Sequence, residues 1–146
     1  MIEHPHLSAP ERLDAARGAV ADLVAQLQAG LDLHSADIFN HSFAADVIWG
    51  GPYGATVSGY DHLHEIHKKL HAAHAAGPSR YEIITVTAPA PDVAVAQVRR
   101  SPQSAHDFAE MALYVLIRDN ERWWLAAGQN TLIQPGLSAT ENTESR

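Results

Sequence analysis

The sequence predicts an α+β fold in which helices pack on one face of a curved antiparallel sheet. Apolar residues recur at helical spacing in the first half of the chain, and four runs rich in β-branched and aromatic residues follow in the second half. The length of 146 residues predicts one compact domain. We expect an N-terminal arm over 1–8, a single domain over 9–134 and a flexible polar tail over 135–146.

The first half of the chain predicts two helices before any strand. Ser8–Glu11 has the spacing of a capping box, and apolar residues follow it at steps of three and four. A helix is therefore expected over about 9–29, with Gly30 ending it. Ser35 is placed to cap a second, short helix. The extended run Val47–Trp49 then predicts a strand.

A glycine-rich loop and a third helix come next. Three glycines and a proline fall within Gly50–Gly54, a composition that favours a turn beside a strand end. A helix is expected from Gly59 to the stop signal at Gly77, because apolar residues again recur at helical spacing: Leu63, Ile66, Leu70 and Ala73.

The second half predicts four strands joined by short turns. The four runs are Tyr81–Ala88, Val93–Arg100, Phe108–Arg118 and Trp123–Leu132. Short links between successive strands favour an antiparallel meander. Two or three helices do not fill a strongly bent sheet, so we expect a concave, mainly apolar cavity with a few polar residues.

Composition restricts the partners and the chemistry. Seventeen acidic residues oppose ten basic ones, and the net charge of −7 makes a nucleic acid or an anionic membrane an unexpected partner. The chain has no cysteine, which excludes disulfides and thiolate ligands or nucleophiles. It has no phosphate-binding glycine motif, so no cofactor is expected. Without a signal-peptide pattern or an apolar span, the expected location is cytoplasmic.

Histidine is the most unusual feature of the composition. Five of the ten histidines lie in the third predicted helix, where His67 and His74 border the apolar face. His67 and His71 have the i, i+4 spacing of a zinc pair, but Lys68 and Lys69 stand between them, and two lysines disfavour a dication. We therefore expect no metal. His67 is the candidate acid or base of the cavity; alternatively it is a histidine at the edge of the core.

Two adjacent amides near the end of the last predicted strand are candidates for the cavity. Gln129 shares a strand face with Trp123, and Asn130 shares the other face with Trp124. The alternation does not decide which face is inside. Either amide could orient a ligand carbonyl or stabilise an oxyanion; the alternative is an amide that caps a loop. Both are retained as catalytic candidates.

Glu110 is a carboxylate in a mainly apolar strand. Buried in the cavity, it could act as a general base or acid, whereas pairing with Arg99 on the neighbouring strand would keep it ionised. An exposed position on the outer face is the third alternative. We treat Glu110 as a catalytic candidate, and Arg99 and Met111 as candidates for substrate binding.

Aromatic and imidazole side chains complete the expected lining. Trp49 and Tyr53 flank the glycine-rich loop and can supply a flat apolar wall, although aromatic residues at such spacing also occur in ordinary cores. His71 lies one helical turn after His67 and is included as a substrate-binding candidate.

Several segments together resemble the nuclear transport factor 2-like, or SnoaL-like, superfamily over about residues 10 to 134. They are Val24–Leu27, Phe43–Trp49, Gly54–Tyr60, the hairpin strand Tyr114–Arg118 and the final strand Trp123–Thr131. Within that superfamily, Gln129–Thr131 is similar to the SgcJ/EcaC-type branch, whose members occur near pathways for secondary metabolites, including enediynes.

The resemblance implies a cone-shaped α+β barrel of the cystatin-like type, with a ligand cavity inside and a homodimer formed through the open sheet. It implies a small-molecule ligand, and we expect a neutral polyketide-like or aromatic intermediate. The expected chemistry is proton transfer or cofactor-free oxidation, in an isomerase- or cyclase-like enzyme or a cofactor-independent oxidoreductase. The alternative is a non-catalytic carrier or protective binding module, because fold alone does not determine reaction.

Overall fold

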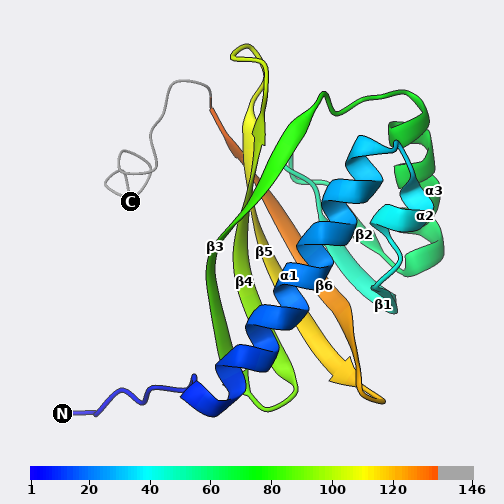
Figure 1. Ribbon diagram of the computed structural model, residues 1–146. Helices are drawn as coiled ribbons and strands as arrows, with labels where there is room; N and C mark the ends of the chain where they lie inside the picture. The colour runs from blue at the N-terminus through cyan, green and yellow to red at the C-terminus, as the bar shows by residue number, and fades with distance from the viewer. Residues whose placement is uncertain (135–146) are drawn as a thin grey trace.

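The computed structural model describes residues 1–134; the tail predicted over 135–146 lies outside the described residues. It confirms an α+β fold in which three helices accompany one curved six-stranded sheet (Figure 1). The elements are α1 (Pro10–Asp32), α2 (Ala36–Phe39), β1 (Phe43–Gly50), β2 (Thr56–Ser58), α3 (Tyr60–Ala72), β3 (Ser79–Ala90), β4 (Val93–Pro102), β5 (Ala109–Asp119) and β6 (Arg122–Ile133).

The sheet has the strand order β2-β1-β6-β5-β4-β3. The four predicted strands form the antiparallel meander β3 to β6, as the short turns require. β1 pairs with β6 in parallel, so the sheet is mixed and not wholly antiparallel as predicted. The reason is the connection: β3, β4 and β5 intervene between β1 and β6 in the chain, so no hairpin sets the direction of this pair.

The first helix differs from its prediction at both ends. Ser8 does not cap it; its hydroxyl accepts a hydrogen bond from the backbone N–H of Ala88 at 2.9 Å and so ties the arm to β3. Gly30 does not end it either, because α1 continues to Asp32. A Cβ on Gly30 would lie 2.6 Å from the backbone nitrogen of Phe39, so this glycine lets α2 pack directly against α1.

The second and third helices place the side chains of the site. Ser35 caps α2 as predicted, accepting from the N–H of Ile38 at 3.2 Å. In α3 the predicted apolar stripe is only partly buried: Leu63 is inside, but Leu70 is 47% exposed and His67 takes the inner position. His74 lies beyond the end of the helix, in the left-handed region with φ 51°, and is exposed.

The core lies between α1 and the concave face of the sheet. Figure 1 shows α1 running across that face, with α2 between α1 and α3, and α3 beside β1. The sheet presents small residues to the helix, which lets the two layers approach closely. The helix contributes Ala16, Ala19, Val20, Leu23 and Leu27, and the sheet contributes Ala88, Ala94, Ala96 and Val98.

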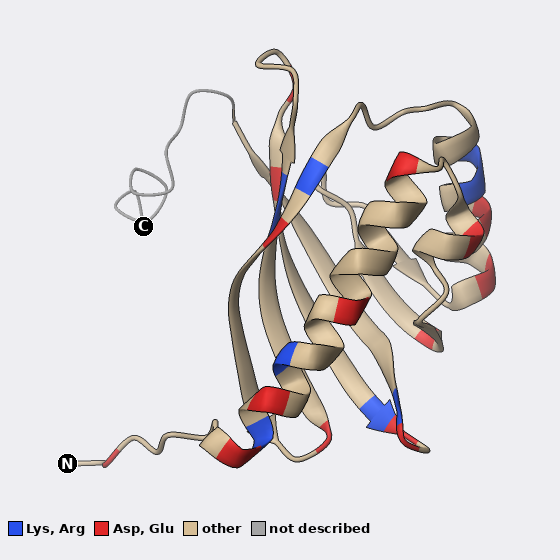
Figure 2. Cartoon of the chain, viewed as in Figure 1, with Lys and Arg blue, Asp and Glu red and all other residues tan. Residues whose placement is uncertain are grey.

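Charged residues lie mostly on the helices and at the strand ends. Figure 2 shows long stretches of the sheet without Lys, Arg, Asp or Glu. Among the described residues, no helix is long and apolar enough to cross a membrane.

Candidate functional site

A cavity of about 400 Å³ opens between the concave face of the sheet and the helices, a size suited to one small organic molecule. All three helices and five of the six strands contribute to its wall. The apolar and aromatic part includes Leu31, Phe39, Trp49, Tyr53, Leu70, Tyr81, Val98, Phe108, Ala112 and Tyr114. The polar part consists of His34, His67, His71, His74, Arg100, Glu110 and Asn130.

His67 is the most enclosed polar group of the wall. Helical geometry turns it toward the sheet from α3, and the residue is only 6% exposed. The rings of Phe39 and Trp49 meet the imidazole edge-on, with centroids 5.1 and 5.3 Å away. Asn40 donates from Nδ2 to His67 Nδ1 at 2.7 Å.

This environment keeps His67 uncharged at neutral pH. Burial lowers the pKa of His67 from 6.5 to about 4, with smaller contributions from the nearby His71 and His64. Nδ1 is occupied by Asn40, and Nε2 has no hydrogen-bond partner among the described residues. Within residues 1–134, every side-chain nitrogen or oxygen that is fully buried has a hydrogen-bond partner, so an atom without a partner is not fully buried. Nε2 is therefore accessible from the cavity that His67 lines.

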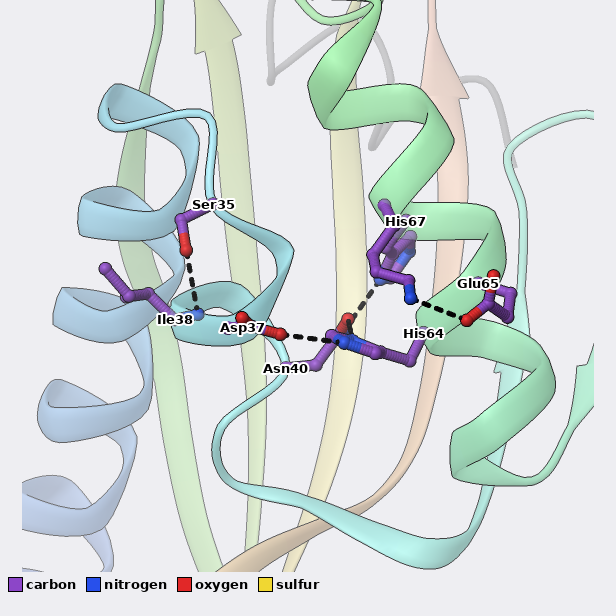
Figure 3. A network of polar contacts seen from close by, with 8 residues as sticks. Ser35, Asp37, Ile38, Asn40, His64, Glu65 and His67 are labelled. Carbon is purple, nitrogen blue, oxygen red and sulfur yellow. Dashed lines mark hydrogen bonds and ion pairs between the residues drawn. The ribbon is translucent and has the colours of Figure 1, made fainter.

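The contact between Asn40 and His67 belongs to a chain of polar contacts that reaches the surface (Figure 3). Asn40 is fully buried, and its Oδ1 lies 2.9 Å from His64 Nδ1. On the other side of the imidazole, His64 Nε2 lies 2.9 Å from a carboxylate oxygen of Asp37, whose side chain is 87% exposed. α2 and the residue that follows it thus supply two of the four groups, and α3 supplies the other two.

An ion pair forms part of the sheet wall. Arg100 donates from one guanidinium nitrogen to Glu110 at 3.0 Å and from another to the Ser79 hydroxyl at 2.7 Å. Both charged side chains are largely buried, so the pair presents little net charge to the cavity. Of the alternatives considered for Glu110, pairing on the neighbouring strand is found, but with Arg100 and not with Arg99. Arg99 does not line the cavity, and its Nε donates to Ser101.

Two tyrosines stand near that ion pair. Burial raises the pKa values of Tyr81 and Tyr114 well above the ordinary value, so both hydroxyls keep their protons at neutral pH. Each is a neutral hydrogen-bond donor or acceptor at the cavity wall.

A β-bulge decides which of the two amides faces the cavity. The register of β5 and β6 shifts between Leu125 and Ala127, so Leu125 and Asn130 face the same side although their numbers differ in parity. Asn130 is buried, lines the cavity and donates from Nδ2 to the Gly50 carbonyl at 2.9 Å. Gln129 is exposed and does not line it.

Three of the four other predicted lining residues line the cavity. Trp49, Tyr53 and His71 line the cavity, whereas Met111 does not. Trp49 lies over β6 at a glycine: a Cβ on Gly128 would be 2.9 Å from its ring. Tyr53 is at the mouth, 74% exposed, and packs edge-on against Phe108.

The geometry at the histidines does not resemble a metal centre. Within residues 1–134, no group of three or more His, Cys, Asp or Glu side chains is arranged to hold an ion. Of the i, i+4 pair, His67 already has its Nδ1 bound by Asn40.

Sequence reasoning did not single out Asn40, His64, Arg100, Tyr81 or Tyr114 as site residues. A usable signal existed for Arg100, because Ala94, Ala96 and Val98 alternate in β4 and place residue 100 on their face. For Asn40 and His64 no such signal exists, because their contact depends on how segments distant in the sequence pack together.

Scans against protein-family models and curated proteins found no match. Solved structures match over most of the chain. A protein from Caulobacter vibrioides with a cystatin-like fold has 16% identity and a TM-score of 0.73, covering 90% of this chain and 99% of that one. A nuclear transport factor 2-like protein from Shewanella oneidensis has 12% identity and a TM-score of 0.69, covering 79% and 98%.

A second nuclear transport factor 2-like protein, from Pseudomonas putida, has 16% identity and a TM-score of 0.67, covering 88% of this chain and 92% of that one. All three are described as uncharacterised or of unknown function. The chain therefore has the nuclear transport factor 2-like, cystatin-like fold, with a cavity of ligand size on its concave side. At these identities the likeness concerns the fold and not the activity.

Proposed function

We propose that the chain binds a neutral, ring-containing small molecule in the cavity and transfers a proton to or from it through His67. A polyketide-like or aromatic intermediate of secondary metabolism is the ligand class that fits the resemblance to the SgcJ/EcaC-type branch. Proton transfer is the first of the two chemistries expected from the sequence, and His67 supports it better than an oxidation.

The single observation that carries the proposal is the state of His67. It is an uncharged imidazole, fixed at Nδ1 by Asn40, with Nε2 accessible from an apolar cavity. A neutral imidazole can accept or donate a proton, and anchoring one nitrogen orients the other for a bound ligand. A histidine that served packing alone would not need a nitrogen open to the cavity.

The rest of the wall favours a neutral and partly aromatic ligand. Trp49 and Tyr114 supply large ring surfaces. Arg100 and Glu110 compensate each other, so a charged ligand would lose its hydration without gaining an unpaired counter-charge. Asn130 uses its amide N–H on Gly50, which leaves its oxygen to accept from a ligand hydroxyl.

Binding is tested with 2-naphthol, a neutral two-ring probe, titrated calorimetrically into wild-type protein and two tryptophan variants. Trp49→Ala removes a ring from the cavity wall and is expected to weaken binding by about tenfold or more. Trp124→Ala is the matched control, because Trp124 does not line this cavity. Equal losses in both variants would place the probe elsewhere and contradict the proposed binding site.

Proton transfer is tested with 2-tetralone, a neutral aromatic ketone with exchangeable protons beside its carbonyl. In D₂O the wild-type protein is expected to accelerate exchange of these protons, followed by NMR. His67→Gln should reduce the accelerated rate by about 10²-fold or more while binding of 2-naphthol persists. His62→Gln, an exposed histidine of the same helix, should exchange like wild type.

The same two measurements separate an enzyme from a carrier or protective module. A protein that binds 2-naphthol through Trp49 but never accelerates exchange, for this and other neutral ketones, is a binding module. In that case His67 forms a hydrogen bond with the ligand and does not transfer a proton.

A further inference from the structure

The polar chain that ends at His67 controls more than the orientation of the ring. Asn40 has a donor end and an acceptor end, and each faces a different imidazole. If one histidine accepts a hydrogen bond from the amide, the other histidine must therefore donate one to it. Because His67 is uncharged at neutral pH, its single ring proton sits either on Nδ1 or on Nε2.

In the structure, Asn40 Nδ2 faces His67 Nδ1 at 2.7 Å, so Nδ1 accepts and the ring proton of His67 is on Nε2. Asn40 Oδ1 faces His64 Nδ1 at 2.9 Å, which requires a proton there. The Asp37 carboxylate accepts at 2.9 Å, which requires a second proton on His64 Nε2. This arrangement is that of a positively charged His64, and it gives the cavity an N–H donor.

A neutral His64 satisfies the same neighbours in only one other way. It keeps the proton on Nε2 for Asp37 and leaves Nδ1 as an acceptor, so the amide of Asn40 must rotate by half a turn and present its N–H to His64. Its oxygen then faces His67, which must carry its proton on Nδ1. Nε2 of His67 becomes a free acceptor toward the cavity.

We propose that Asp37, His64 and Asn40 form a switch that sets the tautomer of His67. A charged His64 makes His67 a proton donor to the cavity, and a neutral His64 makes it a proton acceptor. The three are positioning residues, since none of them lines the cavity. The inference rests on the proposed function in one respect: proton transfer by His67 gives its tautomer a catalytic role. The tautomer itself is a property of the ligand-free protein.

The surroundings of the two histidines fit such a switch. Asp37 on α2 and the stacked ring of Tyr60 on α3, 5.1 Å away, are the titratable groups in contact with His64. Lys68 and Glu65, also on α3, are paired with each other at 2.7 Å. Around His67 the packed groups of α2 and β1 are aromatic and uncharged, and the titratable neighbour besides His64 is His71. Of the two histidines, His64 is therefore the one in contact with an exposed carboxylate, that of Asp37.

The test is a long-range ¹H–¹⁵N NMR titration of ligand-free, ¹⁵N-labelled protein, with the His67 signals assigned by their loss in His67→Gln. As pH rises through the titration of His64, the His67 proton is expected to move from Nε2 to Nδ1. Asp37→Asn removes the carboxylate that accepts from His64 Nε2, so the pH at which the His67 proton moves should change. Asp14→Asn, an exposed carboxylate on α1, should leave it in place.

Asn40→Asp provides a second, independent test. Its carboxylate has no donor, so it should hold the His67 proton on Nδ1 throughout the titration. The proposal is overturned if the His67 tautomer in wild type stays constant while His64 titrates, or if Asn40→Asp leaves the proton on Nε2. If Asn40→Asp does not fold, the wild-type and Asp37→Asn titrations still decide. Failure to bind 2-naphthol would overturn the proposed function and leave these spectra unchanged.

Discussion

The ring of His67 is uncharged because apolar aromatic side chains pack around it. Aromatic rings of α2 and β1 surround it, and one amide hydrogen bond replaces the water it would have at the surface. Burial disfavours the imidazolium form. Donation from Asn40 to Nδ1 requires an unprotonated Nδ1, which only the neutral ring has. The free energy of unfolding therefore depends on pH through His67.

That dependence has a definite sign. Because the pKa of folded His67 is about 4 and the ordinary value is 6.5, the unfolded chain binds a proton in this window that the folded chain does not. The contribution is fully present above pH 6.5 and is lost as the pH falls toward 4, by about 3 kcal/mol in total. Urea unfolding of wild type and His67→Gln at several pH values checks this.

The variant is expected to lose less stability than wild type between pH 6.5 and 4. A smaller slope of the same sign should remain, because the pKa of His71 is also lowered. His62→Gln controls for the removal of an exposed imidazole from the same helix. Parallel pH profiles for wild type and His67→Gln would show that His67 titrates normally.

Arg100 and Glu110 allow a comparison between a buried and an exposed ion pair. Arg100→Met leaves the Glu110 carboxylate without its partner in a largely buried site and is expected to lower the free energy of unfolding by about 3 kcal/mol. Arg118→Met breaks the exposed pair with Asp92 and should cost less than about 1 kcal/mol. Urea denaturation measures both, and similar costs would mean that solvent screens the cavity pair.

At the scale of the element, the contact between α1 and α2 decides where the polar chain of the site begins. Gly30 lies in the last turns of α1, directly against the backbone of Phe39. The short helix α2 carries Asp37, and Asn40 follows it at once. Any displacement of α2 therefore moves both groups relative to α3.

Two glycine substitutions in the same helix are expected to have opposite effects. Gly30→Ala places a Cβ 2.6 Å from the Phe39 backbone, which must shift, so stability should fall by about 1–3 kcal/mol. Gly18→Ala meets nothing within 4 Å and should raise stability by about 0.5–1 kcal/mol, because alanine restricts the unfolded chain. Thermal unfolding measures both, and a stabilising Gly30→Ala would contradict the close contact.

At the scale of the whole molecule, the outer face of the sheet suits an interface. Of the sequence-predicted site residues, Gln129, Arg99 and Met111 do not line the cavity, and they alternate with strand residues that do. Leu113 is 46% exposed there, beside Gln97 and Gln129 in register. Met and Arg, which this face carries as Met111 and Arg99, are enriched in protein interfaces. We propose that this face forms the homodimer that the resemblance implies.

Leu113→Glu tests the dimer. A charge in the middle of the outer face should convert the protein to a monomer, because a buried unpaired carboxylate disfavours association. Leu33→Glu is the control: Leu33 is 66% exposed at the end of α1, away from the sheet face. Sedimentation velocity reports the mass of each variant. A wild-type monomer, or a dimer that survives Leu113→Glu, would reject this interface.

Local sequence patterns predicted most of the fold. The period of the apolar residues indicated three helices and a four-stranded meander, because these patterns reflect which side of a single element is buried. They did not indicate β2, a strand of three residues, or the parallel pairing of β1 with β6. The cap at Ser35 was predictable because its hydrogen bond joins residues three apart.

The candidate site was predictable only in part, for the same reason. Helical period placed His67 at the apolar face, and the positions of Trp49 and Tyr53 beside the glycine-rich loop indicated a lining role. The choice of Asn130 over Gln129 depended on a bulge, which inverts strand alternation and follows from pairing with β5. The partner of Glu110 proved to be Arg100, which pairs in register with it.

The sequence by itself determined the elements other than β2, their order and the histidine-rich character of α3. Only the tertiary structure decided that Asn40 joins His64 to His67, that α2 packs on Gly30, and which strand face encloses the cavity. The physical reason is the range of the interactions. Helix and strand formation depends on neighbours a few residues apart, whereas register, bulges and buried polar contacts are selected by packing between segments distant in the chain.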